Sequence, residues 1–230
     1  MSFQDKLLDS FIAFEQVIDL DNPVHTVRKN ALKRFESDGF PTKKDELWKY
    51  TSLKSIIQKD YSLSVKSNPN VGLKDIEKYS INDIDSYKIV FVDGVFNPFL
   101  SNTTHDGMDI CVLSAALSKT KYKKTITKYF NKIVPDDQSL ASLNTSYTKE
   151  GAYIHIPKSV LPEDPVQILH FSSGKNKPLW LQPRNIIIVE ENARVEIIER
   201  HQSLRSHDGA TNSLTAVSYT HLTLPTNTPV

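Results

Sequence analysis

A run of short β-rich segments in the second half of the chain places the strongest limit on its fold. After Gly151, apolar runs at 153–156, 166–171, 184–189 and 194–200 are separated by tight turns, with no helical pattern between them. Strands that follow one another in this way build an all-β unit. The pattern predicts a sandwich, a barrel or a β-solenoid, and composition does not choose among the three.

The first sixty residues predict a small helical module. Apolar side chains recur at helical spacing over 3–19. Asn22 and Pro23 suit the cap and first turn of a second helix, which is expected to end at Gly39. A short third helix is expected near 43–50. Helices of this length are unstable alone, so the module must pack against the rest of the chain.

The middle of the chain predicts a mixture of strands and helices. Residues 61–86 are polar and have the composition of a linker. The apolar run 88–92 leads into Asp93-Gly94, which is a strong signal for a β-hairpin. The segments expected after it are a strand at 109–113, helix within 114–133, and a further helix that opens at Pro135.

The overall composition is that of a globular protein without a strong charge bias. The 230 residues are 39% hydrophobic and 24% charged, with a net charge of +1, which gives no electrostatic case for binding nucleic acid or an acidic membrane surface. The sequence contains no apolar run long enough to span a bilayer and does not begin like a signal peptide. A single cysteine excludes an internal disulfide framework. These features predict a cytoplasmic protein.

The stretch 39–51, which reads GFPTKKDELWKYT, combines a helix stop with the start of another helix. Glycine ends one helix, Pro41 prevents its return, and Thr42 can cap the next helix with an acidic residue in capping-box spacing. Locally this predicts a helix–turn–helix corner with Trp48 as a buried packing anchor. Together with the upstream helix at 28–35, the stretch resembles the amino-terminal region of SufD-type proteins. These belong to the SufB/SufD family of scaffold subunits that assemble iron–sulfur clusters.

The same resemblance extends into the β segments. The stretches 143–147 (LNTSY), 156–158 (IPK), 164–166 (DPV) and 184–193 (RNIIIVEENA) are similar to segments that open the core of that family. The family core is a right-handed parallel β-helix, which buries its interior by stacking rungs. The resemblance therefore implies an α+β chain, in which a helical module and a mixed segment precede the first two or three rungs of a truncated β-helix.

The expected division of the chain follows from these observations. Similarity to the family fades near Leu214, about halfway along its usual length, and residues 218–226 resemble translated adaptor sequence. We expect four segments: a helical module at 1–60, a mixed segment at 61–150, the start of the β-helix at 151–214, and a non-native or disordered tail at 215–230.

The resemblance also implies a function. Family members act as non-catalytic scaffold subunits, which pair with SufB-like subunits and with the ATPase SufC. An iron–sulfur cluster and a flavin are expected only in the assembled complex, and no cofactor is expected on this chain alone. Two other classes stay open: a generic helical-plus-β interaction module, and a β-solenoid enzyme acting on polysaccharide.

Individual residues give little support to catalysis. Glu196 and Glu199 are three apart on an expected strand, hence on opposite faces, and make a poor acid–base pair. Cys111 lies in an apolar strand and suits a small buried hydrophobic residue. His155 alternates with isoleucines and is expected to point outward, and all seven histidines are interpreted as solvated: His25, His105, His155, His170, His201, His207 and His221. We expect no catalytic, cofactor-binding or metal-binding residue.

Overall fold

The computed structural model describes residues 2–63, 71–81, 84–105, 107–130, 138–174 and 177–219. The helices are α1 (Phe3–Glu15), α2 (Pro23–Asp38), η1 (Glu46–Trp48), α3 (Lys54–Ile57), α4 (Leu73–Ile76), η2 (Glu77–Tyr79), η3 (Pro98–Leu100), α5 (Leu113–Ser118), α6 (Thr120–Tyr129) and α7 (Ser139–Ser146). The strands are β1 (Tyr87–Val92), β2 (Val95–Phe96), β3 (Asp109–Val112), β4 (Ala152–Ile156), β5 (Val166–Ser172), β6 (Trp180–Leu181), β7 (Arg184–Val189), β8 (Ile197–Ser203), β9 (Ala210–Thr211) and β10 (Leu214–Tyr219). No helix within these ranges is both long and apolar enough to cross a membrane.

Local signals in the sequence set the ends of the first two helices. The Ser2 and Asp5 side chains form a reciprocal capping box at the start of α1. The Asn22 side chain accepts a hydrogen bond from the Val24 N–H at the start of α2, which ends at Gly39 with a positive φ of 67°. The predicted cap and stop of the second helix are confirmed.

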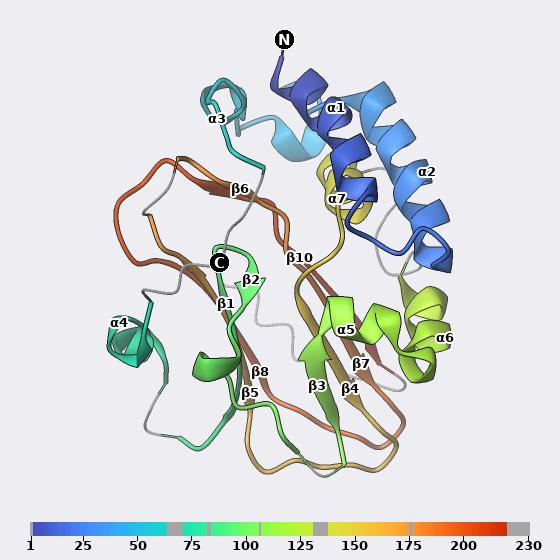
Figure 1. The fold of residues 1–230 in the computed structure, drawn as a ribbon, viewed down its shortest axis with the longest axis vertical. Coiled ribbons are helices and arrows are strands. Elements are labelled where there is room, and N and C mark those ends of the chain that lie inside the picture. The colour runs from blue at the N-terminus through green and yellow to red at the C-terminus, as the bar shows by residue number, and fades with distance from the viewer. Residues whose placement is uncertain are drawn as a thin grey trace.

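The helical module docks on α7, which leads into the β region. The helix α2 packs along α7. The buried guanidinium of Arg28 donates two hydrogen bonds, of 2.9 and 2.7 Å, to the Thr148 carbonyl oxygen just beyond α7. Figure 1 places α1, α2 and α7 together at one end of the sheets. A helix pair too short to stand alone is thereby held by the β region, as expected.

The predicted hairpin forms at Asp93-Gly94. Both residues have positive φ, 51° and 78°, and they join β1 to β2 with Val92 opposite Val95. Two successive residues in this conformation match the twist of the flanking strands. Asp93 is also buried, and its carboxylate accepts hydrogen bonds from the backbone N–H and the hydroxyl of Ser173 at the end of β5. The hairpin is therefore anchored to the neighbouring strand.

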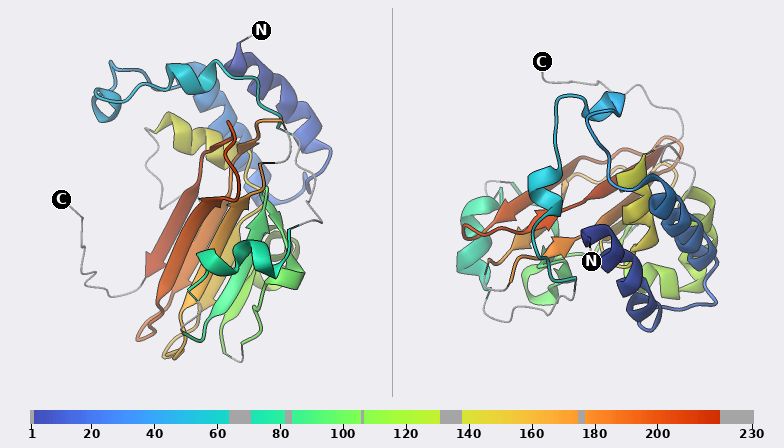
Figure 2. Two further views of the ribbon diagram at one scale, coloured as in Figure 1. Left: turned by 90° about the vertical axis from the view of Figure 1, so that its left-hand side faces the viewer. Right: turned by 90° about the horizontal axis from the view of Figure 1, so that it is seen from above.

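Parallel pairing between distant strands organises the β region. One sheet has the order β2-β1-β5-β8, a second the order β10-β7-β4-β3, and a short third sheet pairs β6 with β9. From β4 to β10 the chain visits the second, first and third sheets in turn, twice, before returning to the second. From β7 onward, each strand pairs in parallel with the strand about 30 residues before it, as β7 does with β4 and β8 with β5. Figure 2 shows these strands stacked side by side.

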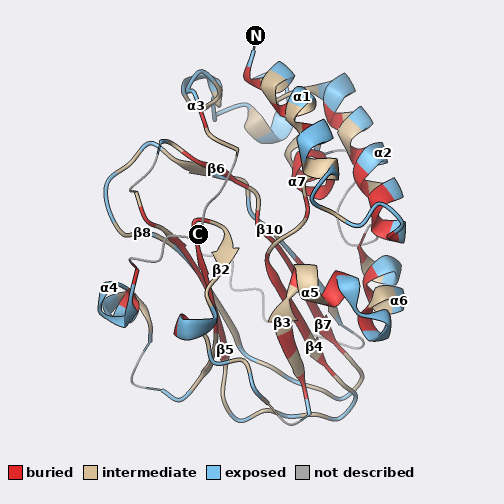
Figure 3. Cartoon of the chain, in the orientation of Figure 1, coloured by how far each residue is buried: buried red, intermediate tan, exposed pale blue. Residues whose placement is uncertain are grey.

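An apolar core fills the space between the two four-stranded sheets. Alternate residues of each strand point into it, as the two-residue period of a strand requires. The buried members include Ile89 and Phe91 of β1, Ile154 and Ile156 of β4, Val166 and Ile168 of β5, and Ile187 and Val189 of β7. Figure 3 shows these strands as the main buried part of the molecule.

Helices cover the outer faces of both sheets. The face of β4 and β7 that carries Tyr153, Ile186 and Ile188 packs against α5 and α6. The opposite face of β1 and β5 packs against Ile76 and Val71 around α4. All six residues of β7 are buried, which is typical of a strand covered on both sides.

The structure is an α+β chain, as predicted, with helices and with parallel and mixed sheets. The structure places β10 at 214–219, so residues 215–219 of the segment expected to be non-native or disordered pair in parallel with β7. The physical reason is that alternating Leu214, Ala216 and Ser218 continue the register of β7. Residues 220–230 lie outside the described ranges, and the four-segment division of the chain stays a prediction.

Candidate functional site

A group of polar side chains interrupts the apolar filling between the two sheets. We call it the inner cluster and define it as His170 of β5, Glu199 and His201 of β8, Asn185 of β7 and Thr215 of β10. The ligand atoms of His170, Glu199 and His201 all lie within 4.8 Å of one another. His170 and Asn185 are buried, whereas His201 and Thr215 are exposed. The cluster therefore runs from the interior to the solvent.

Strand register creates this cluster. Parallel pairing puts Phe91, His170 and His201 at successive positions across β1, β5 and β8. Their rings form a continuous stack: 4.8 Å and 14° between Phe91 and His170, and 4.6 Å and 8° between His170 and His201. The stack starts at the buried ring of Phe91 and ends at the exposed imidazole of His201, so it leads from the core to the solvent.

Hydrogen bonds hold the carboxylate of Glu199 in place. The His201 Nε2–H donates to Glu199 Oε1 over 2.8 Å, and the Thr215 hydroxyl donates to Glu199 Oε2 over 2.6 Å. The Asn185 amide nitrogen lies 3.0 Å from Glu199 Oε1 and 3.1 Å from the Thr215 oxygen. Strands from both sheets thus fix one carboxylate.

Burial and these hydrogen bonds leave His170 uncharged and Glu199 ionised. Burial lowers the pKa of His170 to about 3, with the nearby His201 acting in the same direction, so His170 is neutral at physiological pH. Burial alone would raise the pKa of Glu199, but the hydrogen bonds from His201 and Thr215 outweigh it and leave that pKa lowered. The cluster therefore presents a neutral imidazole beside an ionised carboxylate.

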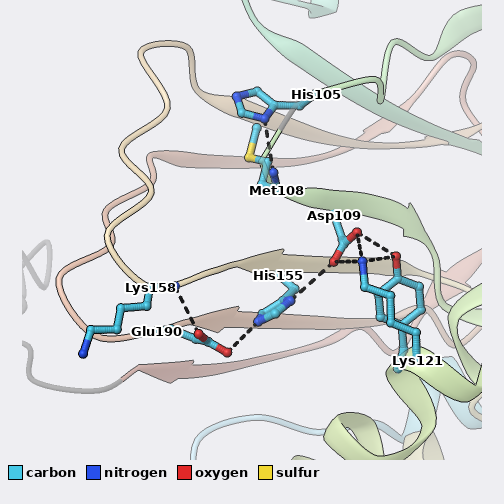
Figure 4. A network of polar contacts seen from close by, with 8 residues as sticks. His105, Met108, Asp109, Lys121, His155, Lys158 and Glu190 are labelled. Atoms are coloured by element: carbon cyan, nitrogen blue, oxygen red, sulfur yellow. Dashed lines mark hydrogen bonds and ion pairs between the residues drawn. The ribbon is translucent and has the colours of Figure 1, made fainter.

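A second histidine–carboxylate group lies on the outer face of the β10-β7-β4-β3 sheet, and Figure 4 shows it from close by. We call it the outer network: Asp109 of β3, His155 of β4, Glu190 after β7, and Lys121 and Tyr122 of α6. His155 Nε2 lies 2.9 Å from Glu190 Oε1, and His155 Nδ1 lies 3.4 Å from Asp109 Oδ2. Both ring nitrogens therefore face a carboxylate oxygen.

The helix α6 completes the outer network. Lys121 Nζ donates to Asp109 over 2.9 Å, and the Tyr122 hydroxyl donates to the same carboxylate over 2.7 Å. Burial tends to raise the pKa of Asp109, yet the bonds from Tyr122 and Lys121 leave it lowered. A hydrogen bond from His155 is the main cause of the lowered pKa of Glu190. The network thus ties α6 to the edge of the sheet.

The structure corrects the interpretation of the histidines as solvated. His170 is buried, the side chain of His155 is only 16% exposed between its two carboxylates, and His25 is buried beside Glu15. The predicted outward direction of His155 is confirmed, because its neighbours Ile154 and Ile156 fill the core. The reason for the error is that periodicity gives the face of a strand, but not what covers that face.

Glu199 is the other residue whose role the sequence did not reveal. The structure places Glu196 before β8 and outside the inner cluster, so the two glutamates that are close in sequence are not brought together there. Polar residues recurring at an inward position of successive strands, His170 and then Glu199 and His201, were a signal that could have found the cluster. Recognising this pattern requires knowing which residues of β5 and β8 pair with each other.

Cys111 behaves as the sequence suggested. It is half-buried on β3 and packs beside the cluster of apolar residues under α5 and α6. Burial raises the pKa of its thiol to about 11. The thiol is therefore protonated at neutral pH and is a poor nucleophile or ligand.

The stretch 39–51 departs from its predicted local structure. The expected third helix is a single 3₁₀ turn, η1, and Trp48 is half-buried rather than a buried anchor. Leu47 and Tyr50 are 78% and 90% exposed. The reason is that one turn provides no continuous apolar stripe, whereas the half-buried Phe40 just before it packs against the adjoining core.

Comparisons with known proteins point to one family. The family model described as "SufBD protein N-terminal region" matches residues 1–168. The chain is 25% identical over 180 residues to the iron–sulfur cluster assembly SufBD family protein slr0076 of Synechocystis sp., covering 78% of this chain and 39% of that protein. It is 24% identical over 200 residues to the iron–sulfur cluster assembly protein SufD of Escherichia coli, covering 83% and 43%. The chain spans less than half the length of the curated relatives it matches.

Proposed function

The chain belongs to the SufBD family, and we propose that it serves as a non-catalytic scaffold subunit in iron–sulfur cluster assembly. The observation that carries the proposal is the family match over residues 1–168, which runs from α1 into β5. The names of the similar proteins, which are iron–sulfur cluster assembly proteins, support the same role.

The strand order supports a finer proposal about the fold: the β region forms the first rungs of a right-handed parallel β-helix. Tyr153 pairs with Ile186, and Ile186 pairs in turn with Ala216, so one sheet gains a parallel strand with each circuit of the chain. The other two sheets gain strands in the same order, as Trp180 pairs with Ala210. Repeated circuits of this kind are how a solenoid stacks its rungs.

The partners that we propose are SufB-like and SufC-like subunits. The outermost strands β8 and β10 have described neighbours on one side only, so their other backbone edge can pair with a further strand. Such an edge supports either continuation of the β-helix or contact with a related subunit. The ATPase would then supply the energy-consuming step, and this chain would supply a surface on which the cluster is built. We place this assembly in the cytoplasm.

Cofactors of the assembly belong to the whole complex under this proposal. The iron–sulfur cluster is the product that the complex builds. A flavin does not fit the cavity of about 590 Å³ beside α1. That cavity is lined mainly by apolar side chains, and its charges, Lys149 and the half-buried Glu150, oppose each other, which gives no cradle for a flavin's phosphates.

Co-purification tests the scaffold role. The intact protein is co-expressed with tagged SufB-like and SufC-like subunits from the same source and followed through size-exclusion chromatography. We expect a stable complex whose reconstitution yields the absorption of an iron–sulfur cluster. A folded protein that elutes alone in every combination would overturn the proposal.

A strain lacking the gene gives an independent measure of the same role. We expect lower activity of iron–sulfur enzymes in that strain, restored by the intact gene. Unchanged activities would favour a generic interaction module instead.

A further inference from the structure

The inner cluster has the composition of a metal site. Within the described ranges, His170, Glu199 and His201 are the group of histidine, cysteine and carboxylate residues close enough to share one ion. Two imidazoles and a carboxylate suit divalent ions such as Zn²⁺ or Fe²⁺. The three side chains come from adjacent parallel strands, β5 and β8, so the register of the sheet sets their spacing.

The hydrogen bonds of Asn185 orient one ligand toward the others. Its Oδ1 accepts from the Ala152 backbone N–H over 2.9 Å, which turns its amide nitrogen toward the cluster. Because an amide nitrogen only donates, His170 Nε2, 3.4 Å away, faces it with a lone pair. A metal ion binds imidazole through this unprotonated nitrogen, and the ion would replace the 3.4 Å contact with Asn185.

Glu199 is held in the manner of a supported metal ligand. Asn185 and Thr215 both donate to its carboxylate, one from each of two strands in the facing sheet. Partners of this kind fix the direction of a ligand and raise the affinity of a metal site. We propose that His170, Glu199 and His201 together bind one divalent transition-metal ion in the space between the two sheets.

Binding requires one side chain to move. A metal–imidazole bond lies in the plane of the ring, and the rings of His170 and His201 are parallel and 4.6 Å apart, so one ion cannot lie in both planes. His170 is confined, but the side chain of His201 is 38% exposed and can rotate. The ion replaces the hydrogen bond between His201 and Glu199 with a bond to each, while Nε2 of His201 gives up its proton to solvent and the bound ring is left neutral with its proton on Nδ1. Stacking of the two rings is lost as the site closes.

The surroundings allow an ion to enter. His170 and His201, though not Glu199, line a cavity of about 120 Å³ together with Gly94 and Pro183, which gives access to the two imidazoles. That volume holds an ion with several of its water molecules. Three protein ligands leave a fourth tetrahedral position open, which is the arrangement of sites that exchange ligands rather than lock a structural ion. The site stands on these side chains alone, so it does not depend on the scaffold role.

Titration of the intact, metal-free protein with Co²⁺ tests the proposal. We expect one equivalent to bind and to give the visible absorption of a tetrahedral nitrogen–oxygen site, with Zn²⁺ displacing it. Glu199→Gln and His201→Ala should each weaken binding by more than about 100-fold, beyond the 10–100-fold typical of losing a residue that only supports a ligand. His155→Asn is the matched control. It alters the other carboxylate-flanked histidine and should leave Co²⁺ binding unchanged.

Two results would overturn the proposal. One is an unaltered protein that binds Co²⁺ no more tightly than the Glu199→Gln/His201→Ala double variant. The other is an equal loss of affinity in His155→Asn, which would mean that histidines outside the inner cluster share the ion. Circular dichroism confirms that each variant is folded. If the double variant melts early, His201→Ala alone decides, because that side chain is exposed and contributes little to the core.

Discussion

The inner cluster and the outer network use the same residue types in opposite ways. In the outer network both nitrogens of His155 face carboxylate oxygens, and Lys121 balances the charge of Asp109. In the inner cluster the one hydrogen-bond contact of the His170 ring with a described residue is 3.4 Å long and joins it to an amide, and both imidazoles lie within 4.8 Å of one carboxylate. The difference shows that a histidine beside an acid is a structural link when carboxylates face both of its ring nitrogens, and a candidate ligand when they do not.

Position in the fold accounts for this contrast. The outer network joins a helix to a sheet edge, so its bonds stabilise the packing of α6 on β3. The inner cluster lies between two sheets at the point where the filling changes from isoleucine to polar side chains, as Ile168 pairs with Glu199. Polar groups in such an interior must satisfy one another, which makes the inner cluster the more sensitive of the two.

Asn185→Leu should have the largest effect, because it breaks the inner cluster from within. Asn185 is fully buried, and its loss leaves the Ala152 N–H unpaired and removes a donor from Glu199. We expect a loss of about 3 kcal/mol in the free energy of unfolding, from two buried groups left unsatisfied. Urea denaturation measures it. Gln202→Leu on β8, an amide outside the cluster, should change stability by less than about 0.5 kcal/mol. Equal effects would mean that the cluster adds nothing to stability.

Asp109→Asn should lower the free energy of unfolding by less, and it tests whether the outer network affects Co²⁺ binding. The change weakens the bonds from Lys121, Tyr122 and His155 without altering side-chain volume. We expect a loss of about 1–2 kcal/mol, as for charge-assisted hydrogen bonds in a partly exposed site. Co²⁺ affinity should stay the same. A weaker affinity in this variant would contradict the assignment of the outer network to a structural role.

Local patterns in the sequence predicted the elements well. The cap at Asn22, the stop at Gly39 and the hairpin at Asp93-Gly94 each depend on the backbone preference of one or two residues, and each is confirmed. The strand at 184–189 was equally clear, because a run of isoleucines suits a strand buried on both faces.

Local sequence patterns did not predict the contacts between residues that are distant in the sequence. His170 and Glu199 meet because the chain between β5 and β8 completes one circuit and returns in a particular register. A shift by one residue would turn Glu199 away from the interior, since neighbouring residues of a strand face opposite sides. Turn lengths and the packing of the whole sheet decide that register, so the candidate site emerged only from the structure.

Thr215→Val should chiefly change metal affinity. Thr215 donates to Glu199 over 2.6 Å, and valine keeps the shape of the side chain while removing the donor. We expect Co²⁺ binding to weaken by about tenfold, as for other partners of metal ligands. Stability should change little, because Thr215 is exposed. Thr26→Val, an exposed threonine on α2 far from the cavity beside His170 and His201, is the control and should leave the affinity unaltered.

Glu190→Gln should give the smallest effect and shows how the outer network responds to pH. Because the folded-state pKa of Glu190 is lowered, mainly by its hydrogen bond from His155, the ionised carboxylate stabilises the fold. That contribution is fully present above the unfolded pKa, about 4.3, and is lost as the pH falls through the lower folded value. Stability curves of the native protein and the variant should therefore converge in acid and separate above about pH 5.

The separation should stay below about 1 kcal/mol, since the side chain of Glu190 is 45% exposed and solvent screens its interactions. Thermal melts at several pH values measure it. Glu191→Gln is the matched control, because it removes a neighbouring charge that pairs with Lys158 and does not contact His155. A gap between native and variant that widens toward acid would reverse the sign expected for a stabilising carboxylate. The bond to His155 would then not hold the network together.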